Sequence, residues 1–250
     1  MSELADLVIL LDDEKYAACN IKFVIVGTPT GVLEYFVKTK NLESVSNRIE
    51  EIPKVSGFNL PMISTLTSNG FNNILNLKIN NGEIDEISEH VFRVTLGLAQ
   101  RVQEYLLKLA FQITDNKFYY SELLHKSDLD WLKSAFRKNY TTIESHLDDG
   151  LKKYSLNNHV VFCIGEIKIH QFSAEDIFAL IEEKFEFVTG SKDMVYDILK
   201  KMTEGDSPIL RKNPKTYHFR IVDSRYLMCI RTMMYVNGNN GFVEKKNFTF

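Results

Sequence analysis

The pattern of apolar and polar residues predicts two strands near the N-terminus and helices over most of the rest of the chain. Residues 21–26 (IKFVIV) are almost continuously apolar and end at a polar turn, which is typical of a strand buried on both faces. Residues 32–37 predict a helix, and residues 49–52 a second short strand. Residues 4–18 have apolar positions at helical spacing and predict an amphipathic helix. Polar side chains after a buried strand lie where open α/β sheets bind ligands, so this region is expected to form one edge of a nucleotide-type site.

The middle of the chain is expected to be helical throughout. Residues 60–77, 84–96 and 98–112 predict three helices, separated by the turn Asn80-Asn81-Gly82 and by Gly97. The third helix should bury one face, made of Val102, Tyr105, Leu106, Leu109 and Ile113. A further helical stretch over residues 119–155 carries the single tryptophan, Trp131.

The last third of the chain combines helices with a hairpin. Ser173 is expected to cap a helix over residues 174–185, with Asp176 completing a capping box. A second helix is predicted over residues 191–202. Alternation at period two in residues 209–212 and 217–222, across the turn Asn213-Pro214-Lys215-Thr216, predicts a β-hairpin. Residues 225–235 predict a closing helix, and the Asn- and Gly-rich residues from Asn237 predict a flexible tail.

The order helix, helix, hairpin is typical of a winged helix, and charge is concentrated on its hairpin. Residues 159–206 contain 5 Lys or Arg and 10 Asp or Glu, whereas residues 207–236 contain 6 Lys or Arg and one acid, Asp223. Such a local excess of positive charge is the pattern expected for phosphate contact. A wing that packs on a protein partner is the alternative. The candidate DNA-binding residues are Arg211, Lys212, Lys215, Arg220 and Arg225.

Composition narrows the class of protein. The 250 residues are 44% hydrophobic and 25% charged, as in ordinary globular proteins, and the net charge of −3 confines any DNA contact to a local patch. Cys19, Cys163 and Cys229 are widely spaced and predict buried free thiols in a reducing compartment. No apolar run reaches the roughly 18 residues of a membrane span, and the N-terminus is too acidic for a signal peptide. We therefore expect a cytoplasmic protein without a membrane partner.

The common catalytic motifs are absent from the sequence. No G-x-x-x-x-G-K-[ST] phosphate-binding loop occurs, and no glycine is followed by lysine. The six histidines are scattered singly and predict no metal site. Asp12, Asp13 and Glu14 follow an apolar run, but only six residues separate them from the next strand, too few for a parallel crossover. A solvated helix end is the preferred interpretation, and an acidic metal site is the alternative.

Taken together, the chain resembles the C-terminal half of an AAA+ ATPase followed by a winged helix, of the origin-recognition-like or transposition- and defence-associated type. The segment IKFVIVGTP is similar to the sensor 1 strand, which puts the sensor residue on Thr28 and, less favourably, on Thr30. Ser46-Asn47-Arg48 resembles the segment with the arginine finger, so the resemblance implies that role for Arg48. Gly97-Leu98-Ala99-Gln100-Arg101 is similar to the sensor 2 motif of the lid, although Gln100 occupies the usual arginine position. Gln100 and Arg101 are thus the candidate nucleotide-binding residues.

The resemblance implies a fold class of mostly α structure with small β elements, an α+β arrangement. The expected parts are the end of an AAA+ core (1–54), a helical lid (55–114), a helical connector (115–158), a winged helix (159–236) and a tail (237–250). The Walker A and Walker B half is absent, so the chain alone should have no cofactor; ATP and Mg²⁺ would bind only if another segment or chain completed the site. The expected partners are DNA and an AAA+ subunit or a second copy.

Three functions therefore remain open. The first is a truncated or split AAA+-like protein that acts by binding and does not hydrolyse ATP alone. The second is a functional ATPase whose nucleotide site uses Asp13 or Glu14, or is completed by a partner. The third is a protein-interaction module that binds no DNA.

Overall fold

The computed structural model describes residues 10, 14–17, 56–148, 154–185, 190–238 and 242–247. The chain divides into two units, Met1–Ser56 and Gly57–Phe250. In the first unit, Leu10 and helix α2 (Glu14–Ala17) are helical and fall within the helix predicted over residues 4–18. The predicted strands at residues 21–26 and 49–52 and the predicted helix at 32–37 lie outside the described residues. The fold can therefore be followed in the second unit.

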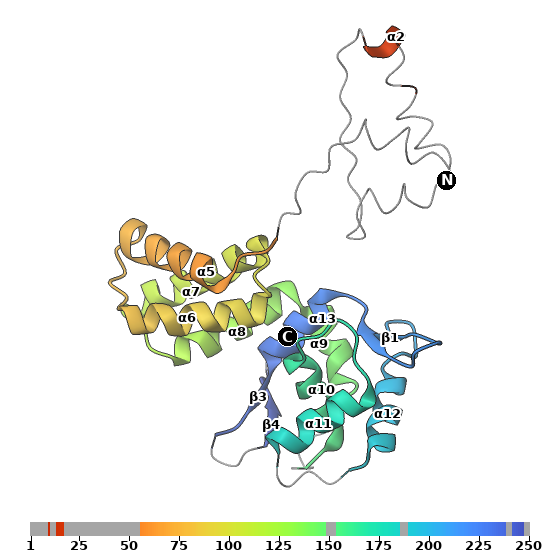
Figure 1. Cartoon of the computed structure of the whole chain (residues 1–250). Coiled ribbons are helices and arrows are strands. Elements are labelled where there is room, and N and C mark those ends of the chain that lie inside the picture. Colours follow the sequence, from red (N-terminus) through yellow and green to blue (C-terminus); the bar gives the residue numbers. More distant parts are fainter. Residues whose placement is uncertain are drawn as a thin grey trace. The chain divides into compact units, whose positions relative to one another are not determined.

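The described part of the second unit is mostly helical and contains short antiparallel strands, which confirms the predicted class of mostly α with small β elements (Figure 1). A single hydrophobic cluster runs through it. Its elements are α5 (Leu60–Ser68), the π-helical turn η1 (Asn69–Ile74), α6 (Asn81–Thr95), α7 (Ala99–Asn116), α8 (Glu122–Ala135), α9 (Arg137–Glu144), α10 (Leu156–Glu166), α11 (Ala174–Lys184), α12 (Lys192–Lys201), β1 (Leu210–Lys212), β2 (Phe219–Ile221), α13 (Ser224–Met233), β3 (Met234–Val236) and β4 (Val243–Lys245).

Helix α6 begins earlier than its sequence pattern predicts. The Asn80 side chain accepts a hydrogen bond from the backbone N–H of Glu83 at 3.0 Å, and the Glu83 carboxylate accepts one from the backbone N–H of Asn80 at 2.9 Å. This capping box draws Asn81 and Gly82 into the first helical turn. The predicted turn at Asn80-Asn81-Gly82 is therefore wrong, because capping of the helix outweighs the turn preference of the Asn-Gly pair.

The corner between α6 and α7 depends on Gly97. Leu96 and Gly97 both have positive φ angles, of 57° and 68°. The backbone N–H of Phe58 donates to the Gly97 carbonyl at 2.7 Å, and the Phe58 carbonyl oxygen would lie 2.1 Å from a Cβ placed on Gly97. Glycine is required here both for the left-handed backbone and for the close approach of the backbone at Phe58.

Helices α7 and α8 form the centre of the helical part. The predicted apolar face of α7 is confirmed, because Val102, Tyr105, Leu106, Leu109 and Ile113 are all buried. Trp131 on α8 is fully buried, with its ring edge-on to Tyr105 at 5.3 Å and to Phe136 at 4.8 Å. The two helices therefore share an aromatic core.

Residues 156–221 build a compact arrangement around α10. The predicted capping box at Ser173 and Asp176 is confirmed at the start of α11, and Ser191 caps α12. Strands β1 and β2 pair antiparallel, as predicted. Phe172, just before α11, pairs with Phe219 of β2 through two backbone hydrogen bonds of 3.0 and 2.7 Å. The chain order is thus helix, one extended residue in the sheet, two helices and a hairpin.

Residues 242–247, within the segment predicted to be a flexible tail, are folded. The helix predicted over residues 225–235 ends at Met233, and Met234 and Tyr235 belong to β3. Strand β4 pairs with β3, so that Val236 lies opposite Val243. Its neighbour Lys246 donates its backbone N–H to the Met233 carbonyl at 2.7 Å. The described tail residues are held by partners that local sequence composition does not reveal.

A buried charged network joins this C-terminal segment to three helices. The Asp128 carboxylate on α8 is fully buried; it accepts a hydrogen bond from the Tyr105 hydroxyl at 2.7 Å and lies 2.9 Å from the His90 ring nitrogen. Its other oxygen is paired with the Lys246 ammonium, which is 10% exposed. Burial acts to raise the pKa of Asp128, but His90 and Lys246 together hold it below its ordinary value. Asp128 is therefore the acceptor on which α6, α7 and the C-terminal segment converge.

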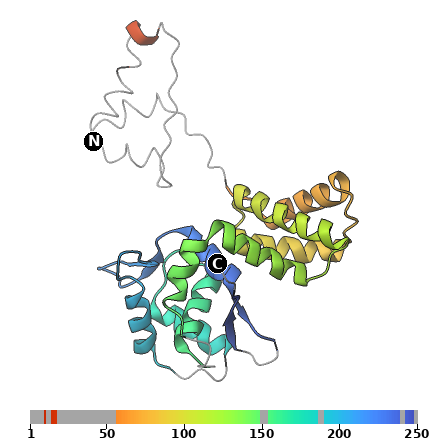
Figure 2. The same ribbon diagram turned by 180° about the vertical axis from the view of Figure 1, so that it is seen from behind.

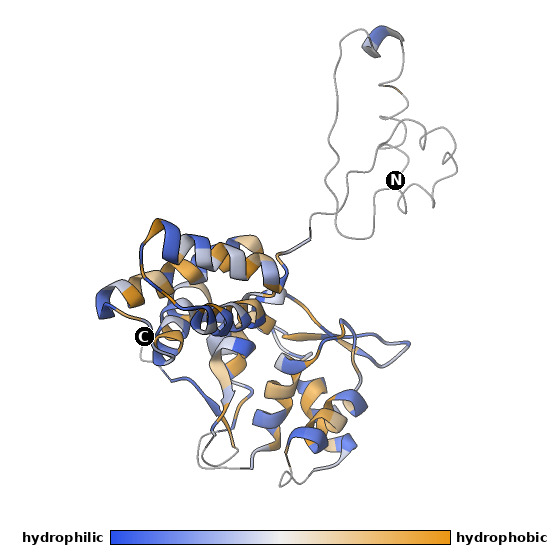
Figure 3. Ribbon diagram, turned by 60° about the vertical axis from the view of Figure 1, so that its left-hand side comes forward, coloured by the Kyte–Doolittle hydropathy of each residue, from blue (hydrophilic) through white to orange (hydrophobic). Residues whose placement is uncertain are grey.

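Apolar residues line the facing sides of the helices, and the outer part of the β1–β2 hairpin is hydrophilic (Figure 3). A few large apolar side chains remain exposed on the helical part, among them Met62 and Leu66 on α5 and Leu107 and Phe111 on α7. Among the described helices, none has the length and apolar character needed to cross a lipid bilayer.

Buried histidines predict loss of stability in mild acid. Burial lowers the pKa of His125, His146 and His159 below the ordinary value of 6.5. The unfolded chain then binds more protons than the folded chain below pH 6.5, so stability should fall as the pH drops from 6.5, by at most about 1.4 kcal/mol per pH unit for buried His159 and by less for the more exposed His125 and His146. Urea unfolding at several pH values between 7 and 5 measures this. His159→Gln, which can keep the bond to the Ser155 carbonyl, should show a shallower fall. An equal fall of stability with pH in wild type and in His159→Gln would show that His159 does not contribute to the loss.

Candidate nucleic-acid interface

The β1–β2 hairpin projects from the edge of the second unit, beyond α12 and α13 (Figures 1 and 2). Its register pairs Leu210 with Ile221, Arg211 with Arg220 and Lys212 with Phe219. Leu210 and Phe219 are buried and attach the hairpin to the core. Because side chains alternate along a strand, Arg211 and Arg220 share the opposite, outward face.

Arg211 and Arg220 form a like-charged pair directly across the hairpin, and both are exposed. Like charges at opposed positions destabilise a two-stranded sheet. In the part of the chain that the structure describes, no carboxylate forms an ion pair with either guanidinium. The repulsion between the two guanidinium groups destabilises the hairpin alone. An anion that lies over both side chains would be attracted by both positive charges and would offset this repulsion.

Lys215 adds a third cation at the turn. The Asn213 side chain accepts the backbone N–H of Lys215 at 2.9 Å, and the Asn213 carbonyl accepts that of Tyr217 at 3.0 Å. These bonds shape the turn and leave the Lys215 side chain exposed. Within the described residues Lys215 has no ion-pair partner, so three uncompensated cations lie on the outer part of the hairpin.

Lys212 has a different environment from the other predicted DNA-binding residues. It is half-buried, and its ammonium lies 4.6 Å from the centre of the Tyr217 ring and 4.9 Å from that of Tyr196 on α12. It also donates a hydrogen bond to the Tyr196 hydroxyl. Lys212 therefore links the hairpin to α12 through two aromatic rings.

The charge of Arg225 is compensated within the chain. Its guanidinium donates to Asp223 Oδ2 from Nε at 2.8 Å and from Nη2 at 2.5 Å. Asp223 also accepts the backbone N–H of Arg225 at the start of α13, and its contacts with Arg225 hold its pKa below the ordinary value. Arg225 is thus a weaker candidate for phosphate contact than the three hairpin cations.

Helix α12 presents charges of both signs beside the hairpin. Its exposed residues include Asp193 and Asp197 as well as Lys200 and Lys201, and Lys192 is paired with Glu175 at 2.5 Å. The positive field is therefore concentrated on the hairpin and not on the helix that precedes it.

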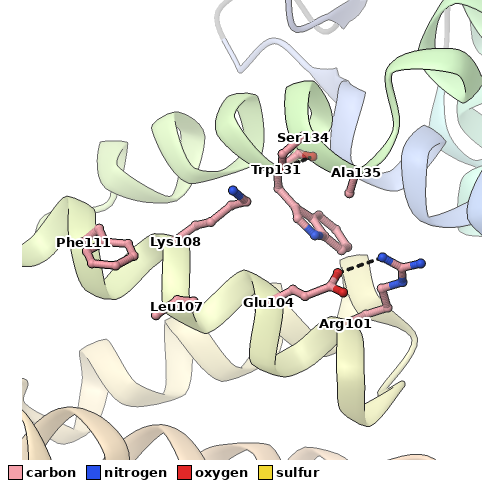
Figure 4. Close-up of a pocket in the computed structure, with 8 residues that line it drawn as sticks. All are labelled: Arg101, Glu104, Leu107, Lys108, Phe111, Trp131, Ser134 and Ala135. Carbon is pink, nitrogen blue, oxygen red and sulfur yellow. Dashed lines mark hydrogen bonds and ion pairs between the residues drawn. The ribbon is translucent and has the colours of Figure 1, made fainter.

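The two predicted nucleotide-binding residues, Gln100 and Arg101, converge on Glu104 in α7. The Gln100 amide donates to Glu104 Oε1 at 2.9 Å, and Arg101 donates to Glu104 Oε2 at 2.7 Å (Figure 4). The Arg101 guanidinium also lies over the Phe136 ring at 5.7 Å. Glu104 neutralises Arg101, so a phosphate group would have to displace that ion pair before it could bind.

Arg101 borders an open groove of about 460 Å³ between α7 and α8 (Figure 4). Leu107 and Phe111 contribute exposed apolar surface, and Lys108 contributes a second cation. The full lining is Arg101, Glu104, Leu107, Lys108, Phe111, Trp131, Ser134 and Ala135. No glycine among the described residues lines the groove, so it differs from the glycine-rich loops that cradle a triphosphate.

Other predicted site residues cannot be placed. Thr28, Thr30 and Arg48 lie outside the described residues, as do Asp12, Asp13 and the side chain of Glu14. Across the described ranges, no cluster of three or more His, Cys, Asp or Glu side chains is arranged to hold a metal ion.

Two aromatic residues at the interface were missed by the sequence argument. Tyr196 and Tyr217 bracket Lys212, although they are far apart in sequence. Tyr217 could have been noticed, because it is an aromatic residue within a predicted basic hairpin. Comparison of the chain with models of protein families, with curated proteins and with solved structures found no match.

Proposed function

We propose that residues 159–236 form a winged-helix module that binds DNA, and that the β1–β2 hairpin is the wing that contacts the phosphate backbone. The order of elements supports this proposal: α10, the extended residue Phe172, α11, α12 and then the hairpin. The opposed, uncompensated pair of Arg211 and Arg220 is the observation that carries it. Phosphate groups would relieve the repulsion between these side chains and release counterions on binding.

We further propose that the chain acts by binding and does not hydrolyse ATP alone, as a truncated or split relative of AAA+ ATPases. The sequence has no phosphate-binding loop, and the one described candidate arginine, Arg101, is already paired with Glu104. Nucleotide and Mg²⁺ would need phosphate-binding residues supplied by another subunit. The exposed apolar side chains on α5 and α7 support contact with such a subunit.

The double substitution Arg211→Ala with Arg220→Ala tests DNA binding. It should weaken binding to a duplex about tenfold or more at roughly 100 mM salt, and reduce the slope of log Kd against log salt concentration by about 2, one for each lost phosphate contact. Fluorescence anisotropy with a labelled duplex measures both quantities. The melting temperature should stay unchanged or rise, because the substitution removes a repulsive pair.

Arg225→Ala is the matched control. It removes an exposed arginine from the same region, but one whose charge Asp223 already compensates, so affinity should change by less than about threefold. If wild-type protein bound neither a duplex nor DNA with a single-stranded segment at about 50 mM salt, DNA binding would be ruled out and the wing would have to serve a protein partner.

A further inference from the structure

We infer that Tyr217 makes the wing a site for unpaired DNA bases. In this arrangement its ring stacks on a base that is outside a duplex, while Arg211, Lys215 and Arg220 hold the neighbouring phosphates. The inference rests on the proposed function and specifies its substrate: DNA that contains a single-stranded segment, such as a duplex with an unpaired extension.

The exposure of Tyr217 is the first observation. It is 62% exposed, the largest value for any tyrosine in the described residues, and it lies beside the turn that carries Lys215. The three uncompensated cations, Arg211, Lys215 and Arg220, lie on the same hairpin, and Lys215 and Arg220 are two and three positions from it in sequence. Grooves that bind single strands combine such cations with aromatic rings on which bases stack.

Backbone strain is the second observation. Tyr217 has a φ angle of 59°, in the left-handed region that glycine and asparagine enter easily and bulky residues rarely adopt. Hydrogen bonds on both sides hold this conformation, from the Tyr217 N–H to the Asn213 carbonyl at 3.0 Å and between the His218 ring and the Thr216 carbonyl at 2.8 Å. Residues held in sparsely populated backbone regions cluster at functional sites.

The ring is also fixed in place before any ligand binds. The Lys212 ammonium lies between the Tyr217 and Tyr196 rings, and the Tyr196 ring contacts buried Phe219 edge-on at 5.8 Å. The aromatic platform is thus tied both to α12 and to the core. Such pre-organisation reduces the entropy lost when a base stacks on the ring.

Helix α12 carries charges of both signs where a duplex would approach it. Asp193 and Asp197 are exposed on the helix that would enter the major groove of a duplex if the module bound as a typical winged helix. Phosphate groups are repelled by these two carboxylates, while exposed Lys200 and Lys201 on the same helix attract them. A single strand that crosses only the wing avoids α12 and keeps its contacts with Arg211, Lys215, Arg220 and Tyr217.

The experiment compares two DNA molecules and three variants. One is a blunt duplex, and the other is the same duplex with a single-stranded extension that carries 2-aminopurine, a base whose fluorescence falls on stacking. Wild-type protein should bind the extended molecule about tenfold more tightly and quench its fluorescence. Tyr217→Phe should keep both effects, whereas Tyr217→Ala should lose the preference and the quenching.

Tyr217→Asn separates function from folding. Asparagine adopts the left-handed backbone more readily than tyrosine. The melting temperature of the Tyr217→Asn protein should therefore equal or exceed that of wild type, yet its preference for the extended DNA should disappear. Equal binding of both DNA molecules by wild-type protein, or an unchanged preference in Tyr217→Asn, would overturn the inference while leaving duplex binding intact. Loss of all DNA binding by wild-type protein would instead overturn the proposed function.

Discussion

Replacing Asp128 with alanine is expected to lower the free energy of unfolding by about 3–5 kcal/mol. The carboxylate is fully buried and accepts from Tyr105 at 2.7 Å and from the Lys246 ammonium. Without it, the Lys246 ammonium, on a side chain that is only 10% exposed, loses its acceptor, and the buried Tyr105 hydroxyl keeps only the Leu124 carbonyl at 3.2 Å. Urea unfolding, followed by the fluorescence of buried Trp131, the single tryptophan, measures the loss.

Asp130→Ala is the control on the same helix. Asp130 is half-buried and accepts a hydrogen bond from Gln112 at 2.7 Å, and its removal should cost about 1 kcal/mol. A second measurement combines Asp128→Ala with Lys246→Met. If the two groups form a pair, the double variant should lose clearly less stability than the sum of the single losses. Strict additivity would show that Lys246 does not depend on Asp128.

The stabilisation by Asp128 should be present at neutral pH and lost only in strong acid. Its neighbours hold its pKa below the ordinary value of 3.8, so the unfolded chain takes up this proton first as the pH falls. Protonation of Asp128 should therefore lower stability at a lower pH than protonation of the histidines, whose effect on stability begins near pH 6.5.

Gly97→Ala is expected to lower the free energy of unfolding by roughly 2–4 kcal/mol. A Cβ at this position would lie 2.1 Å from the Phe58 carbonyl oxygen, so the backbone has to move and weaken the 2.7 Å hydrogen bond between Phe58 and Gly97. The φ angle of 68° adds a further cost for any residue with a side chain. The same urea titration gives the value.

Gly205→Ala separates the cost of the left-handed backbone from the cost of the close contact with Phe58. Gly205 has a φ angle of 84°, but nothing lies within 4 Å of a Cβ built there. Its substitution should therefore cost only the conformational penalty of about 1 kcal/mol. Equal losses at the two positions would mean that the contact with Phe58 is unimportant. A larger loss of stability at Gly97 would show that this glycine has a structural role, independent of nucleotide binding.

The local elements of this chain follow from short-range chemistry and were largely predicted. The buried face of α7 and the capping box at Ser173 and Asp176 depend on residues three or four positions apart. The β1–β2 hairpin depends on alternation across a short turn. Such patterns are visible in the sequence because their partners are neighbours along the chain.

The sequence predicted which segment carries the candidate interface, and the structure changed which of its residues are available for phosphate contact. All five predicted DNA-binding residues belong to the hairpin or its flank, but the structure separates them by their partners. Arg225 is paired with Asp223, a residue two positions away that the sequence could have suggested. Lys212 is held by Tyr196, sixteen positions away on another helix, which no local pattern indicates.

By itself, the sequence determined the mostly helical class, the hairpin and its concentration of positive charge, because periodicity and charge are properties of consecutive residues. Only the tertiary structure decided which charges are compensated, that the C-terminal residues form β4, and that Asp128 is the shared acceptor of Tyr105, His90 and Lys246. The energies of buried charges and of paired strands depend on partners as distant as Asp128 and Lys246, which are 118 positions apart. Such partners become neighbours only when the core is packed.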